Sequence, residues 1–427
     1  MKKINFLNWR LILICTCLVF SIIAVSYKVI SVQIEDSLFL KNEGKKRYIK
    51  YRTINPVRGT IYDRNNTPLA VSIINYDLYA LNGLNTDRYL KLKDAISIQD
   101  DILIDGSFSQ KTLLKKGLTL DEQKTINELH FNNIEIEIRH SRHYPLGDQI
   151  APLIGFYGKD RAQEGIEKSY DSVLSGKNGK QKYYTNAKQK IISKPIEVIK
   201  TIQGQDIQLT IDSTIQFYAY KYLVEAITNN KAKAGTVLVF DNKSGEILAI
   251  ASYPSYNPNN PKREIQKNRA LIEAYELGSV LKPIVFSKAI DKKIFSPDAH
   301  IEIPRRLELG NTIITDPKIY EKLTPKEIVA YSSQVGASKI ALKLGYEELK
   351  NNYYSFGFTK PISINFPSAA FGLMNAKETV SDRELASLGY GYGLKVSPFQ
   401  LTAAYSTFAN NGIRKEFKLL MNDEVTS

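Results

Sequence analysis

A long apolar run near the N-terminus dominates the hydropathy pattern of the chain. Leu11 to Tyr27 contains no charged residue, and the run reaches about 20 residues if the Lys28 side chain extends toward the polar layer of a membrane. An apolar helix of that length can span the hydrocarbon core of a bilayer. The pattern therefore predicts one membrane-spanning helix over residues 11–30.

The apolar run has two interpretations, an uncleaved anchor and a cleaved signal peptide with Ala24-Val25-Ser26 as its cleavage site. The run is long for the core of a signal peptide, which favours the anchor. Lys2, Lys3 and Arg10 precede the run and no acidic residue accompanies them. Since basic flanks tend to stay inside, residues 1–10 are expected in the cytoplasm and the rest of the chain outside the membrane.

Short helical and strand-like patterns alternate after the anchor. Val32 to Lys50 is mixed and charged, which is typical of an exposed helix. Tyr76 to Leu81 and Ile134 to Ile138 are predicted as strands, and Asp121 to Leu129 as a helix. Residues 31–203 are therefore expected to form an α/β region.

The patterns become clearer from Gly204 onward. Gln205 to Ile211 alternates as a strand, and Asp212 or Ser213 can cap a helix that runs to Ile227. Two apolar strands surround a tight turn at residues 241–245. Further helices are expected over residues 279–290, 325–344 and 397–410.

The net charge of +14 favours an anionic environment such as nucleic acid, membrane lipid or an anionic polymer. Lysines are spread along the sequence without an arginine-rich arm or a nucleic-acid motif, so nucleic acid is not an expected partner. A compositional bias of the genome is the other explanation of the charge. The two cysteines, Cys15 and Cys17, lie in the apolar run, and the four histidines lack metal-site spacing, so no metal is expected.

One short pattern carries a candidate chemistry. Ser279 and Lys282 are three residues apart in Gly278-Ser279-Val280-Leu281-Lys282-Pro283. A helix that begins at Gly278 or Ser279 places the hydroxyl and the amine on one face. A lysine whose pKa is lowered by burial can accept the hydroxyl proton, and the helix N-terminus favours a developing oxyanion. Ser-x-x-Lys is a weak pattern by itself, so its context decides.

Five segments in order resemble class B penicillin-binding proteins of the division-specific FtsI type. Arg58-Gly59-x-Ile61-x-Asp63-Arg64-Asn65 and Gly165-Ile166-Glu167-Lys168 resemble parts of their pedestal region. Residues 268–283 look like their nucleophile segment, and 331–339 like their second catalytic motif. Residues 389–401 are similar to a family helix entry.

The resemblance implies an α+β multidomain protein with a single N-terminal transmembrane helix. Residues 31–203 would form an elongated α/β pedestal of the dimerisation type. Residues 204–427 would form a transpeptidase domain with helices on both faces of an antiparallel sheet.

The resemblance also implies a peptidoglycan D,D-transpeptidase of cell division that binds penicillin. Ser279 would be the nucleophile, Lys282 the general base and Ser332 the proton relay. Gln334 would occupy the amide position of the second motif, and Ser333 and Gly278 would contact substrate. No metal or organic cofactor is implied.

The implied partners are lipid II-derived stem peptides, β-lactams, the inner membrane and other membrane proteins of the divisome. The expected location is the cell inner membrane, crossed once, with the bulk of the chain in the periplasm.

Two departures from the family pattern affect these expectations. The second motif normally ends in asparagine, and Gln334 is one methylene longer. The family's Lys-Thr/Ser-Gly motif is not found beyond residue 410, and Lys243-Ser244-Gly245 lies in the predicted hairpin turn instead. The chain is therefore expected to be truncated, with an unpaired sheet edge and an uncovered apolar face. A catalytically impaired form and a non-catalytic divisome scaffold are the alternatives to an active enzyme.

Overall fold

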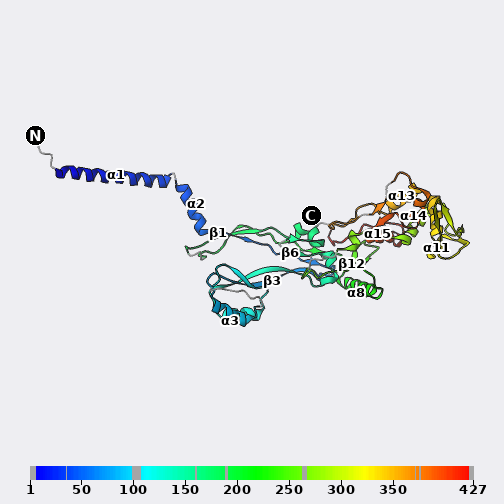
Figure 1. Cartoon of the computed structure of the whole chain (residues 1–427), viewed down its shortest axis with the longest axis horizontal. Coiled ribbons are helices and arrows are strands. Elements are labelled where there is room, and N and C mark those ends of the chain that lie inside the picture. The colour runs from blue at the N-terminus through cyan, green and yellow to red at the C-terminus, as the bar shows by residue number, and fades with distance from the viewer. Residues whose placement is uncertain are drawn as a thin grey trace. The chain divides into compact units, whose positions relative to one another are not determined.

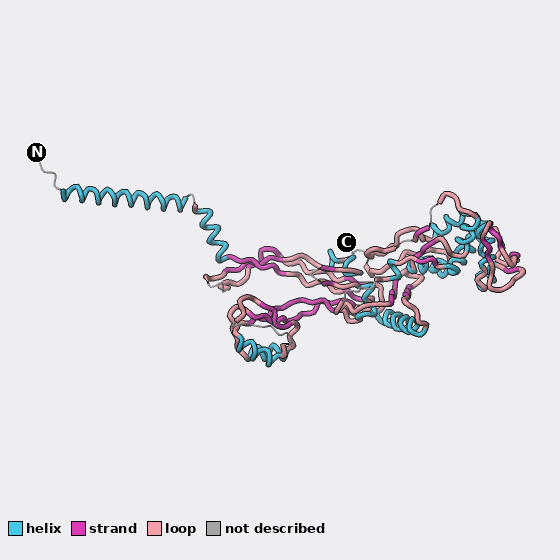
Figure 2. The backbone as a smooth tube through the Cα atoms, in the orientation of Figure 1, coloured by secondary structure: helices cyan, strands magenta, loops and turns pink. Residues whose placement is uncertain are grey.

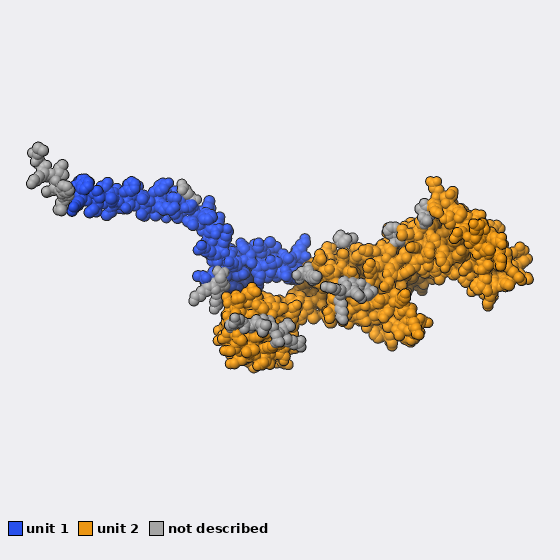
Figure 3. All heavy atoms as spheres, in the orientation of Figure 1, with its two compact units in different colours: residues 1–56, 176–203 blue, residues 57–175, 204–427 orange. Residues whose placement is uncertain are grey.

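The computed structural model describes residues 6–34, 36–98, 107–158, 161–187, 191–261, 267–370, 372–374 and 377–422. The chain forms two compact units (Figure 3). Residues 1–56 and 176–203 make one, here called the anchor unit, and residues 57–175 and 204–427 make the other, the main unit.

The anchor unit contains two helices and a small sheet. Helix α1 (Phe6–Ile34) is followed by α2 (Ser37–Tyr48), which leads into strand β1 (Ile49–Ile54). β1 pairs antiparallel with β8 (Gly179–Tyr184), which pairs with β9 (Ile196–Ile199). Trp9 to Ile34 is long and apolar enough to cross a membrane, so α1 fits a single-pass anchor.

The first part of the main unit, residues 57–175, is built on a five-stranded sheet to which residues 207–208 add one strand. The long antiparallel pair β3 (Pro68–Ala80) and β5 (Ile134–His143) runs side by side over ten residue pairs (Figure 2). Helices α3 (Thr86–Ile96) and α4 (Leu120–Glu128) share an apolar core with these strands. The predicted strands near residues 76 and 134 and the helix at 121–129 are confirmed. The other strands of this sheet are β2 (Ile61–Tyr62), β4 (Thr112–Lys115) and β10 (Ile207–Gln208).

The expected strand over residues 205–211 is shorter than predicted. Only Ile207 and Gln208 form a regular ladder, parallel to β2. The backbone of Thr210 instead donates to the Leu419 carbonyl oxygen, so a segment distant in sequence interrupts the ladder.

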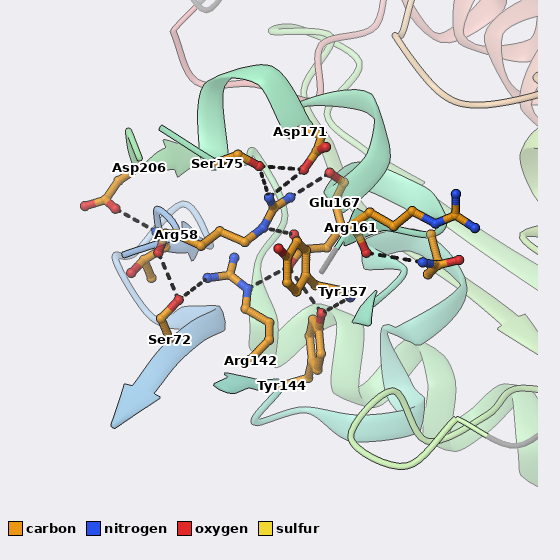
Figure 4. Close-up of polar contacts among 12 residues, drawn as sticks. Arg58, Ser72, Arg142, Tyr144, Tyr157, Arg161, Glu167, Asp171, Ser175 and Asp206 are labelled. Atoms are coloured by element: carbon orange, nitrogen blue, oxygen red, sulfur yellow. Dashed lines mark hydrogen bonds and ion pairs between the residues drawn. The ribbon is translucent and has the colours of Figure 1, made fainter. Parts of the chain in front are cut away.

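A buried ion-pair network joins distant segments of the first part (Figure 4). Arg58 Nε donates to Glu167 Oε2 and Arg142 Nε donates to Glu167 Oε1, both at 2.7 Å. The side chains of Arg58, Arg142 and Glu167 are 7%, 2% and 0% exposed. Arg58 Nη1 also donates to Asp171 Oδ1 at 2.5 Å. One carboxylate thus holds two arginines from separate strands and loops in place.

The network continues toward the second part of the main unit through Tyr144. The Tyr144 hydroxyl donates to Glu167 Oε1 at 3.3 Å. The side-chain amide of Asn259 bonds both backbone groups of Tyr144, at 2.9 and 3.0 Å. Since Asn259 follows strand β12 (Ile247–Tyr253), the network connects the first part of the main unit to the sheet that precedes the candidate site.

Glu167→Gln is expected to lower the free energy of unfolding by about 3–5 kcal/mol, because two buried guanidinium groups lose their shared counter-charge. Denaturant titration of the full chain in detergent, followed by circular dichroism, measures the change. Glu128→Gln, an exposed position on α4, is the control and should change stability little. Equal effects of the two substitutions would contradict a stabilising role for the network.

The second part of the main unit, residues 204–427, contains an antiparallel pair of strands, β11 (Gly235–Phe240) and β12 (Ile247–Tyr253). Helices lie on both faces of this pair. Ala251 packs with Leu223 and Ile227 of α8 (Ser213–Asn229), which lies beside β12 (Figure 1). Leu238 and Ile250 face the opposite way and pack in a core that includes residues of α9 (Arg269–Ile272) and α15 (Pro398–Ala409). This alternation follows from the two-residue period of strands and confirms the predicted arrangement.

The outer edge of β11 is unpaired within the described residues, where β12 is its one strand partner. Beside it, α8 and β11 form an apolar groove of about 450 Å³. The expected open edge and apolar face are therefore present, while the expected truncation stays a prediction. The groove is lined by Ile215, Tyr218, Ala219, Tyr222, Leu223, Ala226, Val237 and Val239.

A second apolar core surrounds the helices that carry the candidate motifs. The expected helical pair at 325–344 is confirmed as α11 (Pro325–Ala330) and α12 (Gln334–Leu344). The helix expected at 397–410 is α15, and its N-cap is Ser397. The other helices are α5 (Ala151–Ile154), α6 (Gly165–Ser169), α7 (Asp171–Leu174), α10 (Lys282–Asp291), α13 (Tyr346–Ser355) and α14 (Asp382–Gly389), with 3₁₀ turns η1 (Gly147–Gln149) and η2 (Gly278–Leu281). The other strands are β6 (Tyr157–Gly158), β7 (Arg161–Ala162), β13 (Tyr275–Glu276), β14 (Ile301–Glu302), β15 (Leu307–Leu309), β16 (Thr312–Ile314), β17 (Lys322–Leu323), β18 (Leu373–Met374) and β19 (Leu394–Val396).

Candidate active site

Ser279 lies in the 3₁₀ turn η2, which runs directly into α10. A helical start at this point was expected, and Pro283 occupies the first turn, where proline is tolerated. The Ser279 side chain is exposed. A hydroxyl here is accessible to a substrate.

Neighbouring segments hold the turn that carries Ser279. The backbone N–H of Gly278, which has φ of 61°, donates to the Gly391 carbonyl oxygen at 3.1 Å. A Cβ on Gly391 would lie 1.9 Å from the Gly278 carbonyl oxygen, so this position has no room for a side chain. Tyr405 of α15 donates its hydroxyl to the Val280 carbonyl oxygen at 2.5 Å. The backbone around Ser279 is therefore fixed before any substrate binds.

The Lys282 amine connects Ser279 to Ser332. Its Nζ is 3.2 Å from Ser279 Oγ, 2.9 Å from Ser332 Oγ and 2.6 Å from the Ser332 carbonyl oxygen. Lys282 is only 1% exposed. Burial lowers the pKa of Lys282 to about 8, against an opposing effect of the Asp316 carboxylate, which raises it. At pH 7 about a tenth of this amine is thus neutral, far more than for a lysine with an ordinary pKa.

Ser332 adopts an unusual backbone conformation between α11 and α12, with φ of 57°. The left-handed region costs a non-glycine residue about 1–2 kcal/mol. Here it directs both the hydroxyl and the carbonyl of Ser332 to the Lys282 amine. Strain of this kind is characteristic of functional sites.

Asp316 organises the second motif and was missed by the sequence analysis. Its Oδ1 accepts from the backbone N–H groups of Gln334 and Val335 at 2.6 and 3.2 Å, and its Oδ2 accepts from Ser333 Oγ at 2.5 Å. It therefore caps the N-terminus of α12. No local signal could identify it, because the helix it caps begins 18 residues later.

Ser333, an expected substrate contact, lies at the start of α12, and its contact with substrate stays a prediction. This residue is fully buried, and its hydroxyl donates to Asp316 and accepts from the Gly336 N–H at 2.9 Å. Ser333 therefore positions the start of α12. Gln334 is half-buried, and its side-chain amide has no hydrogen bond to another described residue.

A cavity of about 600 Å³ lies beside the candidate site and contains neither Ser279 nor Lys282. It is lined by residues of β18 and α14 and by Tyr392 and Gly393, which follow the residue that holds Gly278. The exposed hydroxyl of Ser279, rather than this cavity, defines the candidate reaction centre. Among the described residues, no three His, Cys, Asp or Glu side chains are placed to hold a metal ion.

Residues 235–426 match the family model of the penicillin binding protein transpeptidase domain, and residues 53–209 match that of the penicillin-binding protein dimerisation domain. The chain belongs to the penicillin-binding proteins. It is 32% identical to the peptidoglycan D,D-transpeptidase FtsI of Buchnera aphidicola subsp. Schizaphis graminum, over 99% of this chain and 77% of that protein. It is 31% identical to FtsI of Escherichia coli K12, over 98% of this chain and 74% of that protein. These relatives favour an enzyme of the transpeptidase class over a non-catalytic scaffold.

Solved structures show the same fold in other penicillin-binding proteins. Penicillin binding protein 2X from Streptococcus thermophilus has a TM-score of 0.70 at 23% identity, over 87% of this chain and 61% of that chain. A peptidoglycan synthetase from Bifidobacterium adolescentis has a TM-score of 0.67 at 23% identity, over 87% and 75%. A chain of a peptidoglycan synthase complex has a TM-score of 0.75 at 20% identity, over 97% and 79%.

Proposed function

We propose that this penicillin-binding protein cross-links peptidoglycan in cell division through an ester on Ser279. Ser279 Oγ attacks the carbonyl carbon between the two terminal D-alanines of a stem peptide, and the terminal D-alanine leaves. The amine of a second stem peptide then attacks the ester, forms the cross-link and restores the Ser279 hydroxyl. β-Lactams acylate the same oxygen when their ring amide opens.

The hydrogen bonds of Lys282 carry this proposal. A neutral amine has two hydrogens and one lone pair. The hydrogens are directed to the Ser332 carbonyl oxygen and Ser332 Oγ, at 2.6 and 2.9 Å, which leaves the lone pair for the Ser279 hydroxyl at 3.2 Å. Lys282 is therefore the general base in this mechanism.

The proton then returns to the leaving group through Ser332. Lys282, now an ammonium, donates to Ser332 Oγ, and the Ser332 hydroxyl donates its own proton to the departing amine of D-alanine. The side-chain amide of Gln334 forms hydrogen bonds with the substrate. Gly278, directly before Ser279, contacts the substrate beside the ester. The mechanism uses no metal or organic cofactor.

The expected partners and location follow from this activity. Stem peptides derived from lipid II lie outside the cytoplasm, so residues 31–427 are placed in the periplasm and α1 in the inner membrane. The pedestal, residues 31–203, is proposed to meet other divisome membrane proteins, and residues 204–427 to form the transpeptidase domain.

The full chain in detergent is incubated with a stem pentapeptide that ends in D-Ala-D-Ala, and released D-alanine is measured. Fluorescent penicillin is added in parallel, and the labelled peptide is identified by mass spectrometry. We expect D-alanine release and a penicillin adduct on Ser279. A well-folded preparation that releases no D-alanine and carries no adduct on Ser279 would contradict the proposal.

Gln334→Asn is expected to speed acylation by penicillin by up to about a hundredfold, because an amide displaced by about an ångström can cost that factor in a reaction that depends on position. Stopped-flow fluorescence with labelled penicillin measures the rate. Gln110→Asn, at an exposed position of the main unit, makes the same chemical change away from the site and should leave the rate unchanged. An unaltered rate in Gln334→Asn would show that the longer side chain is no hindrance.

A further inference from the structure

The net positive charge of this protein is concentrated in the anchor unit. Residues 1–56 and 176–203 contain 17 Lys and Arg residues and four Asp and Glu residues, which is +13 of the chain's +14. The main unit, with 41 basic and 40 acidic residues, is nearly neutral. A compositional bias toward lysine would affect both units, so it does not explain this distribution.

Helix α2 has a gradient of side-chain types along its axis. Its first turn exposes Leu38, Phe39 and Leu40, which are 75%, 64% and 47% exposed. Its last turn carries Lys45, Lys46 and Arg47. None of its residues is buried against the rest of the protein. Because an α-helix has about 3.6 residues per turn, these three consecutive apolar side chains point in different directions and do not form one stripe along the helix. One end of α2 is therefore apolar and the other end is basic.

The dimensions of α2 fit the polar layer of a bilayer. Phe39 and Lys46 are seven residues apart, which is about 10 Å along a helix. The headgroup layer on each side of the hydrocarbon core is about 5–8 Å thick. An α2 that crosses this layer therefore places its apolar turn at the hydrocarbon boundary and its basic turn at the outer level of the phosphates.

We propose that α2 crosses the headgroup layer of the membrane that α1 spans and binds anionic phospholipid through Lys45, Lys46 and Arg47. Two observations select a lipid surface as the partner. The apolar turn begins only four residues after Ile34, the end of the membrane-spanning helix, so it continues the membrane contact. The basic turn complements anionic headgroups, and each such residue near an anionic surface strengthens binding about fivefold.

The sheet next to α2 extends the same surface. Tyr48 at the end of α2 stacks on Tyr184 of β8, and Lys182 Nζ lies 4.9 Å from the centre of the Tyr184 ring. On β1, the ring of Tyr51 is 4.6 Å from Lys180 Nζ. Tyrosines with adjacent lysines are typical of the membrane–water interface. This arrangement supports a lipid partner. Charge attraction to an acidic protein would account for the basic turn but not for the exposed apolar turn.

The test uses the full chain with Cys15→Ser and Cys17→Ser, reconstituted in phosphatidylcholine vesicles with or without 30% phosphatidylglycerol. A fluorophore is attached through Phe39→Cys, Asn42→Cys or Leu120→Cys, in separate samples, and quenched by spin-labelled lipids. Leu120 is 72% exposed on the main unit and is the control position. We expect lipid quenching at residue 39 and none at residue 120. Equal quenching at the two positions would overturn the proposal.

The lipid preference is measured at residue 42 with spin-labelled phosphatidylglycerol and phosphatidylcholine. We expect at least about a fivefold preference for phosphatidylglycerol, which K45Q/K46Q/R47Q removes. K231Q/K233Q/K243Q removes three exposed charges from the main unit and should retain the preference. A preference that survives the first triple substitution, or is lost equally in the second, would overturn anionic lipid binding by α2. Penicillin labelling of the same samples tests the proposed function separately.

Discussion

Ser279→Ala is expected to abolish covalent labelling by penicillin and to lower the rate of D-alanine release by a factor on the order of 10⁴–10⁶. A methyl group cannot form the ester, and the surrounding groups retain only their binding and electrostatic effects. The fold should persist, because the Ser279 side chain is exposed and removal of its oxygen creates no buried cavity. Gel fluorescence with labelled penicillin and an assay of released D-alanine measure the two effects.

Ser287→Ala is the matched control for this substitution. Ser287 lies on α10, the helix that follows the turn of Ser279, and its hydroxyl donates to the Ile284 carbonyl oxygen at 2.8 Å. Its removal should leave labelling intact. Persistent labelling of Ser279→Ala would contradict the proposed nucleophile, and mass spectrometry would then locate the reacting residue.

Lys282→Met is expected to slow acylation by about 10²–10⁴-fold, because it removes the base but keeps a chain of similar length in the buried site. In the unaltered protein the acylation rate should rise with pH through about 8, the pKa of Lys282. Below this pH the amine is an ammonium and cannot accept the Ser279 proton. The rate at pH 7 should therefore be about tenfold below the plateau above pH 9. Stopped-flow measurement of penicillin acylation from pH 6 to 10 tests both statements.

Two variants separate the role of the amine from its surroundings. Lys288→Met changes a lysine on the same helix that pairs with Glu348 at 3.5 Å, and it should preserve the pH profile. Asp316→Asn removes the carboxylate that raises the pKa of Lys282, so the profile should shift to lower pH. A profile that does not change between pH 6 and 10 in the unaltered protein would exclude Lys282 as the titrating base.

The contact between Ser279 and Lys282 could be predicted from the sequence, because a spacing of three residues at a helical start brings the hydroxyl and the amine together. The position of Ser332 beside Lys282 could be predicted only through the resemblance of its motif to a known family. The role of Asp316 could not be predicted, since this residue caps a helix that begins 18 residues later. The buried position of Ser333 also depends on Asp316, because the Ser333 hydroxyl donates to that carboxylate.

The fold shows the same division between local and distant causes. The elements β3, β5, α4 and α15 could be predicted from the sequence, because the spacing of apolar side chains differs between strands and helices. The contacts of Glu167 with Arg58 and Arg142 span 109 and 25 residues of sequence. The local sequence pattern does not predict them. The short ladder of β10 likewise depends on the distant partner Leu419.

The close approach of Gly391 to Gly278 limits how this protein can escape β-lactams by mutation. Selection for drug tolerance favours substitutions that slow acylation while the natural reaction continues. At residue 391 every side chain collides with the backbone beside Ser279, the proposed nucleophile, so a substitution there is expected to impair both reactions together. Tolerant variants are expected instead at positions such as Gln334, where the side chain has room to change and the backbone of Ser279 stays in place.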